Sequence, residues 1–153
     1  MPIPEFVLEL RRRVGHDLLW LIGVTAVVVR EGQVLLVQRA DNGRWAPVTG
    51  IVDPGEHPAD AVVREAAEET GVQIKVERLA WVNVTPVVQY SNGDRAQYVD
   101  HTFLCSYVAG EPYAADDESL AAKWCGLDDL PEMTGNLRER IETALRPTTS
   151  TRL

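Results

Sequence analysis

Three glutamates stand close together in the segment from Gly50 to Val72. A helix would bring the carboxylates of Glu65, Glu68 and Glu69 onto one part of its surface. Like charges at this spacing repel one another, so the arrangement is unfavourable unless a cation lies beside it. Hard divalent ions such as Mg²⁺ prefer oxygen ligands and bridge carboxylates to substrate phosphates. The spacing therefore indicates a site for a divalent cation.

Other residues of the same segment have properties that such a site needs. Gly50 allows a close approach of the backbone, so its carbonyl can face the ion. Gly55 lets the loop fold back over the start of the helix. Arg64 can form a bidentate hydrogen-bonded pair that fixes the rotamer of one glutamate. A solvated acidic helix face would explain the glutamates alone, but it gives no reason for the glycines and the arginine.

The segment also follows the pattern G-x5-E-x7-R-E-U-x-E-E-x-G-U, in which U is aliphatic. The matching residues are Gly50, Glu56, Arg64, Glu65, Ala66, Glu68, Glu69, Gly71 and Val72. This pattern resembles the signature of the Nudix hydrolases, and the order of strands before and after it resembles most of the family domain. The resemblance implies an α/β/α sandwich with a mixed β-sheet between helices. It also implies Mg²⁺-dependent cleavage of a pyrophosphate bond in a nucleoside diphosphate linked to another moiety, with Mn²⁺ as a substitute.

The resemblance assigns roles to the residues of the segment. The implied metal ligands are Gly50, Glu65, Glu68 and Glu69. Glu65 would either bind metal or help to deprotonate the attacking water. Glu56 and Arg64 would hold the metal-binding and catalytic groups in place.

One more carboxylate is expected from a loop beyond the long strands. The acidic turn offers Asp116, Asp117 and Glu118 just before a predicted strand. Glu118 is the first choice, because its spacing before Trp124 resembles the placement in some family members. It would accept the proton of the attacking water from across the cleft, swinging in from a flexible loop. The alternative for each of the three is a solvated acidic turn.

Three residues before the signature are candidates for substrate contact. Arg39, Arg44 and Trp45 could touch a phosphate or a base. Packing and solvent exposure are the alternatives for Arg44 and Trp45.

The resemblance also bears on the substrate class. Pro86 lies near the proline of ADP-ribose-cleaving members, and Tyr90 lies near the tyrosine of members that cleave dinucleoside polyphosphates. Thr49 replaces a glycine that often precedes the signature, which weakens any inference about substrate. ADP-ribose-like substrates are favoured, with nucleoside triphosphates as the alternative. A non-catalytic nucleotide-sensing module would usually have lost a charged residue of the signature, and here all are present.

The elements that position these residues can be predicted from periodicity and turn signals. The catalytic helix should start near Pro58 and stop at Gly71. Apolar runs predict a hairpin over 23–39, two long strands over 73–108 and a short strand over 121–127. The expected organisation is an N-terminal helix over 1–20, the hydrolase domain over 21–146 and a flexible tail over 147–153.

Composition limits the other possibilities. The 153 residues suit one domain, and a formal net charge of −8 argues against a nucleic-acid binder. We find no apolar run of membrane-spanning length and no signal-peptide pattern, so a cytoplasmic protein without membrane contact is expected. The predicted partner is a small nucleotide-type substrate. A homodimer is also expected, with the N-terminal helix near its interface.

Overall fold

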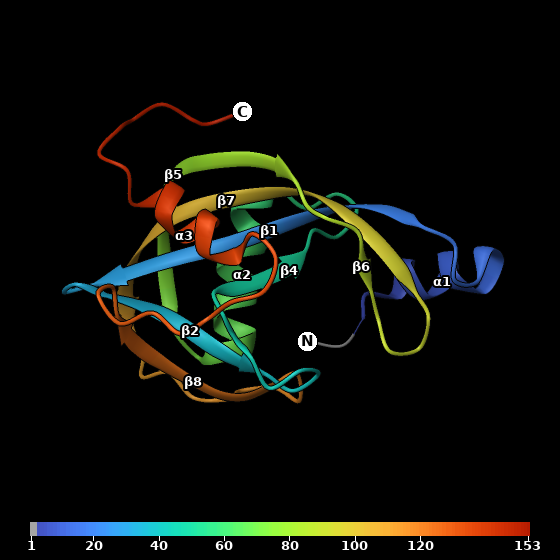
Figure 1. The fold of residues 1–153 in the computed structure, drawn as a ribbon, viewed down its shortest axis with the longest axis horizontal. Coiled ribbons are helices and arrows are strands. Elements are labelled where there is room, and N and C mark those ends of the chain that lie inside the picture. The colour runs from blue at the N-terminus through green and yellow to red at the C-terminus, as the bar shows by residue number, and fades with distance from the viewer. Residues whose placement is uncertain (1–2) are drawn as a thin grey trace.

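Eight strands form one mixed sheet in the computed structural model, which describes residues 3–153 (Figure 1). In chain order the elements are α1 (Glu5–Val14), β1 (Leu19–Arg30), β2 (Gln33–Arg39), β3 (Trp45–Ala46), β4 (Val48–Ile51), α2 (Pro58–Thr70), β5 (Gln73–Val84), β6 (Val88–Gln89), β7 (Arg95–Ala109), β8 (Ser119–Gly126) and α3 (Leu137–Ala144). The predicted hairpin and the two long strands are thus present.

Strand β1 is the centre of the sheet. It runs parallel to β7 in a continuous register from Leu19 opposite Ala96 to Val29 opposite Ser106. Its other edge pairs with β2 at one end and with β4 in the middle, both antiparallel. The order β3-β2-β1-β7-β5 forms the main path, while β8 pairs with β2. This pairing brings β4, which leads into the catalytic helix, next to the strand that organises the sheet.

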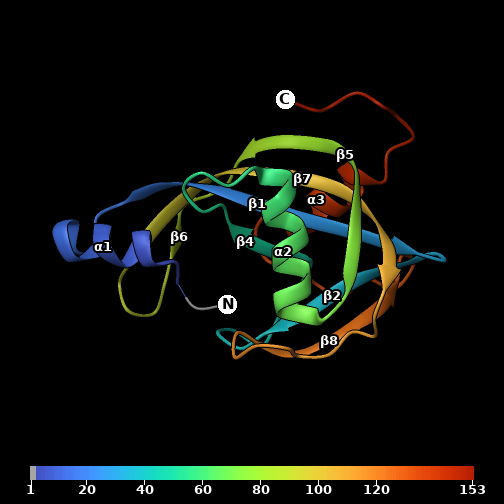
Figure 2. The ribbon, with the colours of Figure 1, turned by 180° about the vertical axis from the view of Figure 1, so that it is seen from behind.

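Helices cover both faces of the sheet, as the predicted α/β/α sandwich requires. Helix α3 lies in front of the strands in Figure 1, and α2 lies in front of them when the molecule is turned round in Figure 2. None of the helices within residues 3–153 is long and apolar enough to cross a membrane.

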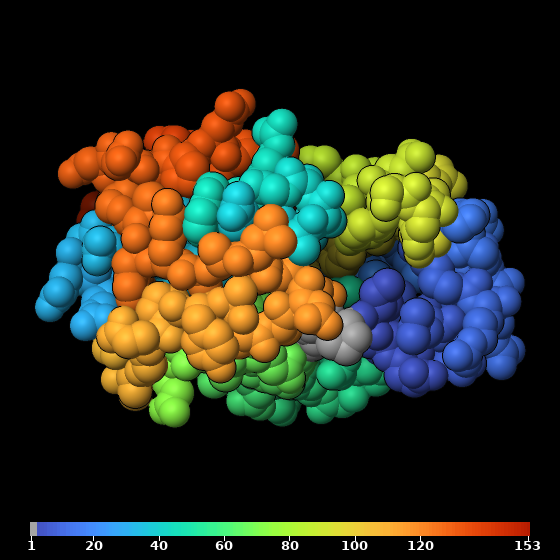
Figure 3. Space-filling view, turned by 90° about the horizontal axis from the view of Figure 1, so that it is seen from below, coloured from blue at the N-terminus to red at the C-terminus, as the bar shows by residue number. Residues whose placement is uncertain are grey.

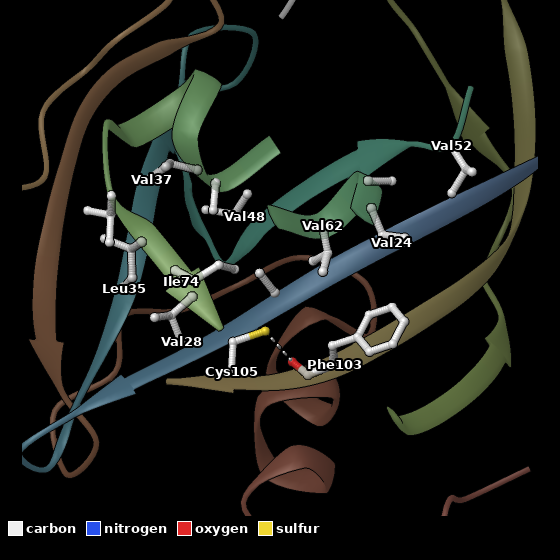
Figure 4. Packing of buried hydrophobic residues seen from close by; sticks show 14 residues of the cluster. Val24, Val28, Leu35, Val37, Val48, Val52, Val62, Ile74, Phe103 and Cys105 are labelled. Atoms are coloured by element: carbon white, nitrogen blue, oxygen red, sulfur yellow. Dashed lines mark hydrogen bonds between the residues drawn. The ribbon is translucent and has the colours of Figure 1, made fainter. Parts of the chain in front are cut away.

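The core under α2 is built from alternate residues of several strands (Figure 4). Val24, Val28 and Leu35 are buried with Val62 of the helix. Successive side chains of a strand point to opposite faces, so the intervening Val27, Val34 and Leu36 join a second cluster under α3. This packing fixes α2 firmly against the sheet, and it leaves the charged side of α2 for the site.

Helix α2 begins and ends where the sequence predicts. Pro58 occupies its first turn, where a missing N–H costs no hydrogen bond. Gly71 follows the last turn in the left-handed conformation, with φ of 71°, and its N–H bonds to the carbonyl of Ala67. A side chain at Gly71 would also collide with the ring of Tyr113.

The two chain ends differ from the prediction. The N-terminal helix ends at Val14 because Gly15 breaks it, and Leu19 and Trp20 belong to β1. The last residues of the segment 147–153, which we expected to be a flexible tail, contact the sheet. Arg152 pairs with β5, donating its N–H to the carbonyl of Ala80, and its guanidinium lies 4.1 Å over the ring of Trp81. The isolated tail sequence gives no sign of this strand partner.

Candidate active site

Gly50 and Glu65 form the buried floor of the site. The Glu65 side chain is fully buried, and a Cβ atom at position 50 would overlap its carboxyl group. The requirement for glycine therefore comes from the Glu65 side chain. One carboxylate oxygen, Glu65 Oε2, is buried and has no hydrogen-bond partner. A buried oxygen of this kind costs free energy unless a cation or a donor satisfies it.

Arg64 ties the acidic residues together with its planar guanidinium. It donates to both carboxylate oxygens of Glu56 at 2.7 and 2.8 Å, to Glu65 Oε1 at 3.0 Å and to Glu68 Oε2 at 3.2 Å. It also reaches the carbonyl of Ile51 at 3.2 Å. The Glu56 carboxylate beside it raises the pKa of Arg64. The same hydrogen bonds lower the pKa of Glu56, so both groups stay charged.

A second group of carboxylates forms around Glu69. Oxygens of Glu69, Asp116 and Glu118 all lie within 4.8 Å of one another. Glu69 is buried, Asp116 is half-buried and Glu118 is exposed. The structure therefore brings the predicted Glu118 to the catalytic helix, and it adds Asp116 beside it. Asp117 is exposed.

The loop that carries these acids is fixed to the end of the catalytic helix. The N–H groups of Tyr113 and Ala115 donate to the carbonyls of Thr70 and Glu69 at 3.1 and 3.0 Å. The carbonyl of Glu118 accepts a bond from Ala40 N–H at 2.8 Å. The loop thus satisfies carbonyls that a helix end leaves open. This arrangement differs from the freely swinging loop expected from the sequence.

Burial and mutual repulsion favour the neutral form of the two innermost glutamates. Burial raises the pKa of Glu65 to about 7, although Arg64 opposes the rise. Burial also raises the pKa of Glu69 to about 8, and the charges of Glu65, Asp116 and Glu118 add to the effect. A divalent cation among them would reverse this balance and favour the ionised form.

Arg39 lies at the edge of the acidic site. Its guanidinium donates to both carboxylate oxygens of Asp41 at 3.0 and 2.9 Å. That pair raises the pKa of Arg39, and the nearby Tyr90 and Glu69 act in the same direction. The hydroxyl of Tyr90 lies 2.7 Å from that of Tyr98. No pattern in the sequence singles out Tyr98, whose position on β7 brings its hydroxyl to that of Tyr90.

The other two predicted substrate residues are placed differently. Trp45 packs against the cluster under α3, with the ammonium of Lys123 lying 4.3 Å over its ring. The packing alternative therefore describes Trp45. Arg44 is exposed, and its backbone joins the turn that holds Arg39.

The donor set fits a hard divalent cation. The described carboxylates offer only oxygen ligands, and Glu65 Oε2 has no other partner. Of the three helix glutamates, Glu69 is the one that meets Asp116 and Glu118, whereas Glu65 and Glu68 both accept hydrogen bonds from Arg64. Space-filling atoms show the face beside the site hollowed between the cyan segment after β2, the yellow-green hairpin around β6 and the dark blue α1 (Figure 3).

Comparison with known proteins identifies the family. The model described as "NUDIX domain" matches residues 20–146. The chain belongs to the Nudix hydrolase family. A "MutT-like protein" of Streptomyces ambofaciens is 36% identical over 112 residues, covering 72% of this chain and 67% of the relative. An "ADP-ribose pyrophosphatase" of Methanocaldococcus jannaschii is 30% identical over 128 residues, covering 82% and 73%.

Solved structures agree with the Nudix assignment. The crystal structure of an ADP-ribose pyrophosphatase from Streptococcus suis matches with a TM-score of 0.67 and 25% identity, covering 86% of this chain and 97% of that one. The predicted Nudix fold and membership of a family of hydrolases that act on phosphorus-containing anhydrides are thereby confirmed.

Proposed function

We propose that this Nudix protein is an Mg²⁺-dependent hydrolase that cleaves the pyrophosphate bond of a nucleoside diphosphate linked to another moiety, of the ADP-ribose type. The observation that carries the proposal is the meeting of Glu69 with Asp116 and Glu118 within 4.8 Å, beside the unpartnered oxygen of Glu65. Two similar proteins that are named ADP-ribose pyrophosphatases support the substrate class.

Each residue has a part in this proposal. Glu65, Glu68 and Glu69 hold the cation, which would supply positive charge for the phosphate oxygens. Arg64 fixes the rotamers of Glu56 and Glu65 through its hydrogen bonds.

Glu118 accepts a proton from the water that attacks phosphorus. It is exposed and its carboxylate can reach solvent, whereas Glu69 beside it is buried and would help to hold the cation.

A substrate screen tests the proposal directly. Purified protein is incubated with Mg²⁺ or Mn²⁺ and with ADP-ribose, nucleoside triphosphates, dinucleoside polyphosphates and nucleotide sugars. We expect release of AMP from ADP-ribose, dependent on the metal. Faster hydrolysis of nucleoside triphosphates would favour the alternative substrate class. Nucleotide binding without any hydrolysis would instead indicate a sensing module.

The general base is tested by three variants of the acidic loop. Glu118→Gln should lower turnover about 10²-fold, the usual contribution of a general base. Asp117→Asn, an exposed neighbour outside the cluster, is the matched control and should keep its activity. If Asp116→Asn were crippled while Glu118→Gln stayed active, the role would pass to Asp116. If neither mattered, Glu65 would be the remaining base.

The other partner expectations belong to the same proposal. The net charge of −8 supports a small nucleotide rather than a polynucleotide as substrate. A homodimer with α1 near its interface is proposed because Leu10 and Val14 are exposed on that helix, at 38% and 39%. Light scattering that gave a monomer mass at micromolar concentration would reject the dimer.

A further inference from the structure

The N-terminal helix α1 packs against the family domain. It precedes residue 20, where the family match begins. Val7 buries against Leu21 and Ala96 of the sheet. Arg11 donates to the carbonyl of Arg95 at 2.7 Å and lies 3.6 Å from Asp94. The helix is therefore held in a defined position beside the β6 hairpin.

A groove of about 570 Å³ separates the start of α1 from the loop that leads into the catalytic helix. Its lining residues are Ile3, Pro4, Glu5, Phe6, Leu8, Asp53 and Pro54. Small-molecule sites commonly have volumes of about 300–1,000 Å³ and mostly apolar walls. Ile3 and Leu8 are exposed at 50% and 37%, so their apolar surface is open to a ligand.

The groove is connected to the catalytic residues through one side chain. Asp53 forms part of its wall, and its carboxylate lies 3.7 Å from Arg64 Nη2. The same guanidinium donates to Glu65 at 3.0 Å. The groove wall is thus two side-chain contacts from the buried floor of the site, and α1 borders the hollowed face in Figure 3.

The charge and polarity of the groove lining indicate which part of a substrate it could bind. Glu5 and Asp53 contribute the charged groups of the lining, and both are acidic. These carboxylates repel phosphate, so a terminal phosphate gains nothing from the groove. The apolar side chains instead suit a ring-bearing group without charge. A nucleoside diphosphate that carries a sugar or second nucleoside has such a group, whereas a nucleoside triphosphate has only phosphate there.

We propose that the groove between α1 and residues 53–54 binds the ring-bearing group attached to the substrate's nucleoside diphosphate. This inference rests on the proposed function, and it makes the N-terminal helix a specificity element. The groove would favour ADP-ribose-type substrates over nucleoside triphosphates because it binds the group that the latter lack.

The test measures the affinity of ADP-ribose and ADP by calorimetry, with Ca²⁺ present in place of Mg²⁺. ADP lacks the terminal ribose and carries one more negative charge on its free β-phosphate, so the decisive quantity is the change that each variant makes in the ratio of the two affinities. Leu8→Trp fills the groove and should weaken the affinity for ADP-ribose about tenfold, as pocket contacts of roughly 1–3 kcal/mol imply. The affinity for ADP should stay unchanged. Ile3→Trp, at the exposed start of the chain, should do the same. Glu9→Trp is the control, because Glu9 is exposed on the same helix, lies outside the groove and is not part of the proposed dimer contact.

Each outcome decides the inference. It is overturned if both groove variants bind ADP-ribose as tightly as the wild-type chain does. Equal weakening of the two ligands would also overturn it, since the groove would then not distinguish them. If the wild type binds ADP-ribose selectively but hydrolyses nothing, the groove stands and the proposed activity fails.

Discussion

Replacing Glu69 by glutamine should stabilise the metal-free protein. In the folded chain burial raises the pKa of Glu69 to about 8 from an ordinary value of 4.5. The folded state therefore holds this proton more tightly than the unfolded chain. The resulting stability is complete below pH 4.5 and is lost as the pH rises toward 8. Glutamine keeps the shape of the side chain but carries no charge.

The size of the effect follows from the same change in pKa. A change of this extent corresponds to roughly 5 kcal/mol, at about 1.4 kcal/mol for each tenfold change in proton affinity. Asp116 and Glu118 are partly open to solvent and can move apart, which relieves part of the repulsion. We therefore expect Glu69→Gln to gain about 2 kcal/mol at pH 8, or roughly 4–8 °C in Tm.

Thermal unfolding at pH 4.5 and pH 8, each in EDTA and in Mg²⁺, measures this prediction. The variant should melt above the wild type only at pH 8 in EDTA. Mg²⁺ should raise the Tm of the wild type and leave the variant nearly unchanged, because the variant has lost a ligand. Asp117→Asn serves as the control for removing an acid in general. A variant that melts at or below the wild type at pH 8 without metal, or that gains as much from Mg²⁺, would refute the reasoning.

Three further changes test other parts of the structure. Gly50→Ala should lower the free energy of unfolding by about 1–3 kcal/mol and turnover by at least 10²-fold, because the added methyl group displaces Glu65. An unchanged melting temperature would contradict this contact. Arg64→Lys should lower kcat more than it lowers Tm, since one ammonium cannot hold Glu56 and Glu65 together; equal turnover would rule this out. Deleting residues 148–153 should lower the Tm by several degrees through loss of the Arg152 contacts, and an unchanged melting curve would show that they add no stability.

The sequence predicts the local parts of the site well. Pro58 and Gly71 mark the ends of the catalytic helix, because their backbone requirements are local properties. The alternation of buried residues in the long strands likewise depends on neighbours in the chain. The spacing of Glu65 and Glu69 on one helix follows from the same geometry.

The parts that depend on distant contacts could not be predicted. The sequence offers Asp116 as a candidate but does not place it beside Glu69, which follows because Tyr113 and Ala115, just before it, bind the last carbonyls of α2. Trp45 faces α3 rather than the site because its place in the sheet register decides its direction. The groove beside α1 arises where Leu8 meets Asp53, and periodicity within α1 does not say which loop it faces.

The pairing of the C-terminal residues with β5 has a consequence for assembly. Strand β5 lies at one end of the main strand path, and an open edge of this kind can recruit the same edge of another molecule. Here the N–H of Arg152 donates to the carbonyl of Ala80, and its carbonyl accepts from the N–H of Val82. Two copies that joined sheets through this stretch would first have to displace the tail, with its contact to Trp81. Residues around Arg152 thus block the pairing of β5 with a second molecule along this stretch. A dimer would have to form through a different surface.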